Sequence, residues 1–489
     1  MGGEPKDWLD YLAQVWHVLV AFFTLLIAVV ASCHAILHKR DTRAAVMWVS
    51  LCWLVPLIGP VLYLTFGINR LRRRASRLRA THTRYHTSAG SLTEHEHPLD
   101  TVTRKTPALA PLVRLVNQAV QQPLLTGNSV EPLINGDAAF PVMVAAIDSA
   151  QHSVTFATYI FDQGKAGTMF VDALKRALQR GVEVRVLIDD TGARYSWPSI
   201  VPKLKQAGIP VARFLPTSVP FRAMAINLRN HRKILVIDGH TAFTGGMNVR
   251  DGHLVVQKPK RPVQDVHFRL GGPIVSYLQE VFADDWLFCT KEELRGPKWF
   301  PPLTNVGPVL ARCVPDGPDD NFEKIRWTIL GAVSCAQKRI RIVNPYFLPD
   351  RGLISALNVA AMRGVQVDII LPQVNNLPFV HWAMMAQLWQ LLERGCRVWL
   401  TEPPFDHSKL MIVDGEWSFI GSSNLDPRSL RLNFELNVEC YCTKLAGDLE
   451  AHIEGKLAKA HQLTLREVDA RPLPIKLRDG VARLLTPYL

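Results

Sequence analysis

The chain has 489 residues, of which 48% are hydrophobic and 20% charged, and its formal net charge is +13. This length predicts two or three folding units, and the apolar content predicts a core together with a lipid-facing segment. The positive charge indicates an anionic partner, either nucleic acid or a membrane surface. The eight cysteines include no C-x-x-C pair, which excludes a zinc site and a disulfide framework of the usual spacing.

Two apolar segments lie near the N-terminus, at residues 12–37 and 44–66, and the polar run HKRDTR separates them. Each is long enough to cross a bilayer as a helix, which takes about 20 residues. A cleaved signal peptide is the alternative, but the acidic first ten residues have the wrong charge for one. We therefore predict a retained two-helix transmembrane hairpin with a basic flank over residues 1–79, in which Pro56 and Pro60 kink the second helix.

Basic residues predict the orientation of this hairpin. Six arginines lie between residues 70 and 79, and three basic residues lie between 39 and 43. The larger cluster predicts that both termini are cytoplasmic and that the short loop is outside. A hairpin lying partly in the cytoplasmic interface is the alternative. Residues 80–105 are polar and without periodicity, so we assign a polar linker to residues 80–124.

The rest of the chain contains an internal repeat. Residues 147–189 read IDSAQHSVTFATYIFDQGKAGTMFVDALKRALQRGVEVRVLID, and residues 333–371 read VSCAQKRIRIVNPYFLPDRGLISALNVAAMRGVQVDIIL. Both give a strand, a helix that ends at R-G-V, and a second apolar strand, which is β–α–β punctuation. The repeat predicts two similar α/β domains, residues 125–290 and 310–489, in a pseudo-twofold arrangement.

One polar motif occurs in each repeat, HRKILVIDG at 231–239 and HSKLMIVDG at 407–415. Both read His-x-Lys-x-x-x-x-Asp-Gly, and both continue into a small-residue turn that ends in asparagine, GGMN at 245–248 and GSSN at 421–424. A single H-x-K on a strand is usually structural. The doubled and extended motif instead predicts two halves of one site.

The doubled motif resembles the HKD motifs of the phospholipase D superfamily, which implies transfer at a phosphodiester. Such a transfer needs a nucleophile, a proton donor for the leaving alkoxide, and positive charge around the phosphate oxygens. Histidine suits the first two roles because its pKa lies near neutral pH. Alternation along a strand places the histidine and lysine of each motif on one face and the aspartate on the other, so the aspartates are predicted to be supports. The candidate catalytic residues are His231, Lys233, Asp238, His407, Lys409 and Asp414, with Asn248 and Asn424 as phosphate-binding residues and no metal or other cofactor.

These residues resemble the HKD motifs of the phospholipase D superfamily, and the resemblance spans nearly all of residues 130–440. Within this superfamily the chain is most similar to the membrane-anchored bacterial cardiolipin synthases. This narrower resemblance rests on the apolar stretch PLIGPVLYLTFG at 56–67 and on the total length. The implied fold is therefore a pair of tandem phospholipase D-like α/β domains behind the membrane hairpin. One departure from symmetry is that the first small-residue turn has Gly246 where the second has Ser422.

A carboxylate is also expected to orient each histidine. In the second repeat Glu435 matches the family pattern for His407, with Glu439 as the competing choice, and in the first repeat Asp265 follows His231. Tyr159 and Tyr346 occupy equivalent strand ends and either line the pocket or pack in the core. By analogy with the family His231 is the nucleophile and His407 the acid and base, although nothing in the sequence distinguishes them.

The resemblance implies a phosphatidyltransferase that converts two phosphatidylglycerol molecules into cardiolipin and glycerol through a phosphohistidine. It also implies a multi-pass protein of the bacterial inner membrane with cytoplasmic catalytic domains and anionic phospholipids as partners. A phospholipase D-type hydrolase is the alternative. A membrane-tethered nuclease is less favoured, because the arginines gather at the membrane flank and no stripe of aromatic and basic residues is present.

Overall fold

The computed structural model describes residues 6–39, 42–67, 98–216, 228–319 and 321–486. The chain divides into two compact units, residues 1–74 and 75–489, which we call the N-terminal unit and the C-terminal unit. The predicted mixed α/β architecture is confirmed, and it belongs to the C-terminal unit.

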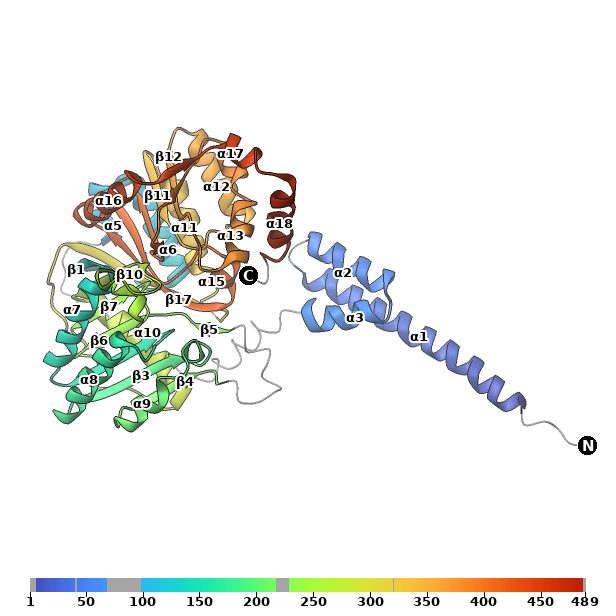
Figure 1. Cartoon of the computed structure of the whole chain (residues 1–489), viewed down its shortest axis with the longest axis horizontal. Helices are drawn as coiled ribbons and strands as arrows, with labels where there is room; N and C mark the ends of the chain where they lie inside the picture. The colour runs from blue at the N-terminus through green and yellow to red at the C-terminus, as the bar shows by residue number, and fades with distance from the viewer. Residues whose placement is uncertain (1–5, 40–41, 68–97, 217–227, 320, 487–489) are drawn as a thin grey trace, which may run out of the picture. The chain divides into compact units, whose positions relative to one another are not determined.

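The N-terminal unit begins with helix α1 (Lys6–His38) (Figure 1). Its segment Val15–His38 has a mean hydropathy of 2.4 and is, among the described residues, the one helix long and apolar enough to cross a membrane. At 1.5 Å per residue this segment is about 36 Å long, which exceeds the hydrocarbon thickness of about 30 Å. The first predicted segment is therefore one continuous apolar helix of sufficient length to span.

The second predicted span, residues 44–66, is divided instead of continuous. Helix α2 (Thr42–Leu54) stops before Pro56, and a short helix α3 (Ile58–Leu62) leads into the π-helical turn η1 (Tyr63–Gly67). A proline has no N–H to continue the helical ladder, which ends α2 after 13 residues, or about 20 Å. The hairpin prediction is thus met only in part.

The chain reverses direction between α2 and α3. A Cβ at Gly59 would lie 2.2 Å from a backbone oxygen of α2, so only glycine permits this close approach. On the return, the Tyr63 hydroxyl lies 2.7 Å from His34 Nδ1 on α1, and Lys39 donates a hydrogen bond to the carbonyl of Gly67. The segment therefore ends beside the end of α1, and the N-terminal part of α1 extends beyond it (Figure 1).

The C-terminal unit is built on one continuous sheet whose strand order is symmetric. The first half runs β4-β3-β2-β6-β7-β9-β1 and the second runs β13-β12-β11-β15-β16-β17-β10, with the extra strand β18 beside β13. The halves join where β1 pairs antiparallel with β10. This order is the structural form of the predicted repeat, and each half has its own hydrophobic core.

The first half consists of the following elements, in chain order: β1 (Leu125–Ile134), α7 (Asn135–Ser149), β2 (Ser153–Thr158), α8 (Lys165–Gln179), β3 (Glu183–Asp189), α9 (Val201–Gln206), β4 (Val211–Phe214), β5 (Arg229–Asn230), β6 (Ile234–Ile237), β7 (Thr241–Gly245), β8 (Val263–Gln264), β9 (Val266–Gly271) and α10 (Ile274–Thr290). The second half consists of β10 (Val309–Asp316), α11 (Lys324–Cys335), β11 (Arg339–Val343), α12 (Arg351–Met362), β12 (Gln366–Pro372), α13 (Pro378–Met385), α14 (Trp389–Leu392), β13 (Arg397–Thr401), β14 (Phe405–Asp406), β15 (Leu410–Val413), β16 (Trp417–Gly421), α15 (Pro427–Arg431), β17 (Asn433–Tyr441), α16 (Thr443–Leu457), β18 (His461–Leu463), α17 (Leu465–Asp469) and α18 (Leu473–Leu484).

Part of the predicted linker is folded. Residues 80–97 lie outside the described residues, but α5 (Pro98–Lys105) and α6 (Ala110–Val120) are helices. Leu112, Val113 and Val116 recur at helical spacing and are buried in the core of the second half. The linker assignment for residues 98–120 was therefore wrong, because this periodicity was overlooked; the other domain boundaries remain predictions.

Candidate active site

The two motif histidines face one cavity of about 1040 Å³, although they belong to different halves of the sheet. The two predicted asparagines, Asn248 and Asn424, line the same cavity. Each histidine comes from the irregular segment just before a buried strand, β6 or β15, so the rigid strand sets its position. The structure thus brings together residues that the sequence separates.

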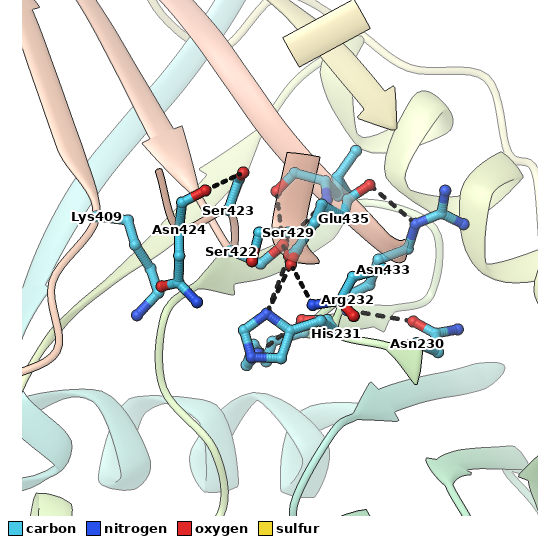
Figure 2. Close-up of polar contacts among 12 residues, drawn as sticks. Asn230, His231, Arg232, Lys409, Ser422, Ser423, Asn424, Ser429, Asn433 and Glu435 are labelled. Atoms are coloured by element: carbon cyan, nitrogen blue, oxygen red, sulfur yellow. Dashed lines mark hydrogen bonds and ion pairs between the residues drawn. The ribbon is translucent and has the colours of Figure 1, made fainter. Parts of the chain in front are cut away.

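Each imidazole is held by a carboxylate from the opposite half. His231 Nδ1 lies 3.0 Å from the Glu435 carboxylate, and His407 Nδ1 lies 2.8 Å from Asp265 Oδ2 (Figure 2 shows the first pair). The predicted orienting residues are therefore present at hydrogen-bonding distance, but the expected pairing within each repeat was wrong. An ionised carboxylate only accepts, so Nδ1 carries the proton and Nε2 keeps its lone pair.

Short strand pairs between the halves enforce this crossing. Strand β5 pairs in parallel with β17, and β14 pairs in parallel with β8. The same ladders continue to the histidines: the His231 N–H donates to the carbonyl of Phe434 (2.9 Å), and the His407 N–H donates to the carbonyl of Gln264 (2.8 Å). Glu435 and Asp265 are the residues immediately after those acceptors, so the crossing follows from backbone register.

An ion pair fixes each motif segment to the long helix that closes its half. In the first half Arg232 donates to the Asp285 carboxylate of α10 at 2.9 Å, with both side chains almost completely buried. In the second half Lys456 of α16 pairs with Asp406. In the first half the motif segment carries the cation and the helix carries the anion, whereas in the second half the motif segment carries the anion. A search for identical residues in the two repeats therefore does not detect this pair of supports.

The two lysines lie beneath the histidines. Lys233 Nζ donates to the carbonyl of His231 at 2.6 Å and lies 5.6 Å from the centre of the Tyr159 ring, and Lys409 donates likewise to the carbonyl of His407. Burial lowers the pKa of Lys233 to about 7 and that of Lys409 to about 8. Part of each lysine population is therefore neutral near physiological pH while no anion is present.

The motif aspartates do not reach the cavity. The Asp238 carboxylate accepts the backbone N–H groups of Gln151, His152 and Ser153 at 2.7–2.8 Å, at the start of β2. Asp414 accepts three backbone N–H groups at the start of β11 over the same distances. Both aspartates thus hold strand ends, in keeping with the supporting role that strand alternation predicts.

The asparagines and tyrosines flank the histidines in matching positions. Asn248 Oδ1 accepts the N–H of Ile160 at 3.1 Å, whereas the buried Asn424 Oδ1 has no partner among the described residues. The Tyr159 ring centre lies 5.0 Å from that of His231, and the Tyr346 ring lies 6.0 Å from His407. Both tyrosines line the cavity, and Tyr346 also packs in the hydrophobic core of the second half.

The two carboxylates differ in their surroundings. Glu435 also accepts from the Ser422 hydroxyl (2.6 Å) and from Asn433 (3.2 Å) (Figure 2). Burial opposes its ionisation, but His231 and Lys233 outweigh burial and hold the pKa of Glu435 below its ordinary value. Burial raises the pKa of Asp265 to about 6. The first carboxylate is thus the more firmly ionised one.

The missing hydroxyl at Gly246 has a steric cause. A Cβ at Gly246 would lie 2.4 Å from Asp265 Oδ1, so no side chain fits beside this shorter acid.

The competing candidate Glu439 is not available to a histidine, because it forms a buried ion pair with Arg312 of β10. Burial lowers the pKa of both imidazoles, that of His407 well below its ordinary value.

Sequence reasoning missed the charge of the cavity wall. Cationic side chains line it from both halves, and they are dispersed in the sequence without a common motif. These are Lys165, Arg229, Arg250, Lys260, Arg261 and Arg428. Within the described part of the chain, no group of three or more His, Cys, Asp or Glu side chains is arranged to hold a metal ion. Three aspartates, Asp162, Asp251 and Asp426, also line the cavity, and Asp162 pairs with Arg250. The cations outnumber these acids, so the wall favours an anionic ligand.

Two α/β halves that contribute one His-x-Lys motif each to a shared cavity define a phospholipase D-like protein. A solved structure of the same fold is the phosphatidylserine synthase of Haemophilus influenzae Rd KW20, which aligns with 77% of this chain and 100% of that chain at a TM-score of 0.60 and 15% identity. This likeness concerns the fold alone.

Two family models match the chain. "Cardiolipin synthase, PLD-like domain" matches residues 143–286 and 329–457, and "Phospholipase_D-nuclease N-terminal" matches residues 26–67. Among curated relatives, a cardiolipin synthase A of Pseudomonas fluorescens (strain SBW25) is 32% identical over 97% of this chain and 99% of its own length. The major cardiolipin synthase of Bacillus subtilis (strain 168) is 32% identical over 96% and 99%. The chain therefore belongs to the cardiolipin synthase family of the phospholipase D superfamily.

The aspartate supports lead to a stability prediction. Replacement of Asp414 by alanine (Asp414→Ala) removes the acceptor of three backbone N–H groups at a residue with φ of +54°. We expect the free energy of unfolding to fall by about 2 kcal/mol, measured by chemical denaturation in detergent. Asp448→Ala, which breaks an exposed pair with Lys444, is the control and should change little. An equal effect of the two substitutions would contradict a supporting role.

Proposed function

We propose that this protein is a cardiolipin synthase that transfers a phosphatidyl group from one phosphatidylglycerol to the glycerol hydroxyl of a second. The observation that carries the proposal is the pair of carboxylate-oriented imidazoles on one cation-lined cavity. Such a site supplies a nucleophile and a proton donor to the same phosphodiester. The cardiolipin synthases that match nearly the whole chain support the choice of lipid.

In the proposed first step His231 Nε2 attacks phosphorus. A P–N bond forms, the P–O bond to the glycerol headgroup breaks, and His407 gives its proton to the leaving oxygen. The firmly ionised Glu435 supports His231 as the nucleophile, because it stabilises the positive charge that the imidazole acquires. The arriving phosphodiester anion favours protonation of His407, whose pKa is low in the empty site.

In the second step the hydroxyl of another phosphatidylglycerol gives its proton to His407 and attacks phosphorus. The P–N bond breaks, cardiolipin leaves, and both histidines return to their starting states. Lys233 and Lys409, with Asn248 and Asn424, are proposed to hold the non-bridging oxygens during both steps. Hydrolysis would follow the same course with water as the acceptor, so exclusion of water decides between transferase and hydrolase.

Product analysis tests this proposal. Purified full-length protein with phosphatidylglycerol in micelles should yield cardiolipin and glycerol in equal amounts. His231→Ala and His407→Ala should each reduce turnover by at least about 10³-fold, since each removes an essential group. After denaturation in SDS at neutral pH, which spares the acid-labile P–N bond, His407→Ala should retain a radiolabelled phosphatidyl adduct that acid releases, and His231→Ala should not. Phosphatidic acid as the sole product would establish the hydrolase instead.

The buried lysines and Asp265 predict the pH profile. A lysine is charged below its pKa, so cationic Lys233 and Lys409 are lost as pH rises through about 7 and 8. An aspartate is charged above its pKa, so ionised Asp265 is lost as pH falls through about 6. We expect kcat/KM to be bell-shaped with its maximum between these values. A profile that stays level up to the ordinary lysine pKa of about 10.4 would contradict this assignment.

For the location, we propose a bacterial inner-membrane protein whose catalytic unit is cytoplasmic. In place of two full spans, we propose that α1 alone crosses and that residues 42–67 enter the membrane from the cytoplasmic side and return to it. The hydrogen bond from Lys39 to Gly67 supports this arrangement. It also collects the basic residues at 39–43 and 70–79 on one side, in accord with the positive-inside rule.

This topology predicts that the two ends of the chain lie on opposite sides of the membrane. In intact spheroplasts, external protease should remove a tag placed before Met1 and spare a tag placed after Leu489. Lysis of the spheroplasts should expose both tags, which controls for protease resistance. Protection of both tags in intact spheroplasts would instead support two full spans.

A further inference from the structure

The last helix, α18, has its apolar and polar faces reversed relative to an ordinary surface helix. Its buried residues are Asp479 and Ala482, at 1% and 2% exposure. Apart from Ile475 on the opposite side of the helix, which is 36% exposed, the large apolar residues between 473 and 485 point outward, with exposures between 44% and 73%. They form what we call the α18 stripe: Leu473, Leu477, Val481, Leu484 and Leu485. A soluble helix buries such a stripe against its core, so this one is left without an internal partner.

Polar contacts hold α18 in place in this orientation. The Asp479 carboxylate accepts from Arg471 at 2.7 Å and from Arg478 at 2.8 Å. The Arg478 guanidinium lies 4.5 Å from the centre of the Trp382 ring on α13, and Arg471 also donates to the Met385 carbonyl at 3.2 Å. Because the buried Asp479 is held by two arginines, the helix is anchored on its polar side and the outward direction of the stripe is specified.

Basic residues border the stripe on both sides. At 100° per residue the stripe covers about 120° of the helix surface, with Lys476 and Arg483 beyond one edge and Arg478 beyond the other. An apolar face with cations along its margins is the pattern of a helix that lies in the headgroup region of an anionic bilayer.

The stripe adjoins the catalytic cavity through α13. Leu377 and Val380, at the start of α13, line the cavity, and Phe379 between them is 55% exposed. Helix α13 packs directly on α18, and Figure 1 shows the two helices side by side. A surface that binds lipid here continues to the edge of the cavity that receives the headgroup.

We propose that the α18 stripe docks on an anionic lipid bilayer and brings the α13 edge of the cavity to its surface. The proposal rests on the proposed function in taking a bilayer lipid as substrate. The chain between Gly67 and Pro98 spans at most about 100 Å, so the membrane unit keeps the stripe near a bilayer. A phosphatidylglycerol molecule can then present its headgroup without leaving the membrane.

Photo-crosslinking tests the docking without need of turnover. Full-length protein carrying benzoylphenylalanine in place of Leu477 is reconstituted into vesicles of phosphatidylglycerol and phosphatidylcholine and irradiated. The control carries the same group in place of Val359 on α12, which is 51% exposed. We expect about tenfold more lipid adduct at 477 than at 359. Equal yields at the two positions would overturn the proposal, as would adducts at 477 to a second copy of the protein.

A pair of exposed substitutions links the stripe to catalysis. Leu477→Glu with Val481→Glu should lower cardiolipin formation in vesicles by about tenfold and leave it unchanged in micelles, where no bilayer is needed. The matched control is Val359→Glu with Met362→Glu on α12, both exposed apolar residues, and it should have no effect in either system. Equal activity of the stripe variant and wild type in vesicles would contradict the proposal. Inactive wild-type protein with specific lipid adducts at 477 would refute the proposed function and leave the docking surface standing.

Discussion

The architecture depends on two carboxylate–imidazole hydrogen bonds that cross from one half of the sheet to the other. Glu435 and Asp265 are almost completely buried, and each reaches a histidine of the opposite half at 3.0 Å or less. A buried ionisable group needs such a partner, because water no longer solvates it. Neither half alone contains an oriented histidine, so the site exists only once β1 and β10 have joined the halves.

The two halves share the same strand order, but several side chains at the site differ between them. The long acid Glu435 is accompanied by the Ser422 hydroxyl, whereas the short acid Asp265 leaves room only for Gly246. The backbone is thus repeated while the two acids acquire different pKa values. The proposed transfer reaction benefits from this difference, since in that proposal one histidine attacks phosphorus and the other exchanges a proton with the leaving and entering oxygens.

The apolar surface of the molecule is distributed over both units. In the N-terminal unit α1 is long enough to cross a bilayer, while α2 and α3 turn back after part of that depth. In the C-terminal unit the contacts of Arg471 and Arg478 with the buried Asp479 hold the apolar side of α18 outward. Together with the cationic cavity wall, these features suit a protein whose substrate remains in a membrane while the chemistry takes place at the membrane surface.

The sequence by itself determined the repeat, the β–α–β order, the first long apolar helix and the identity of the paired motifs, because each of these is a local pattern of spacing and hydrophobic period. Alternation along the strand also identified Asp238 and Asp414 as residues that face away from the site. Only the tertiary structure decided which acid serves which histidine, since the strand pairs β5–β17 and β14–β8 join residues about 200 and 140 positions apart. It likewise decided that the second apolar segment turns back and that α18 faces outward, because both depend on packing between segments that no local pattern encodes.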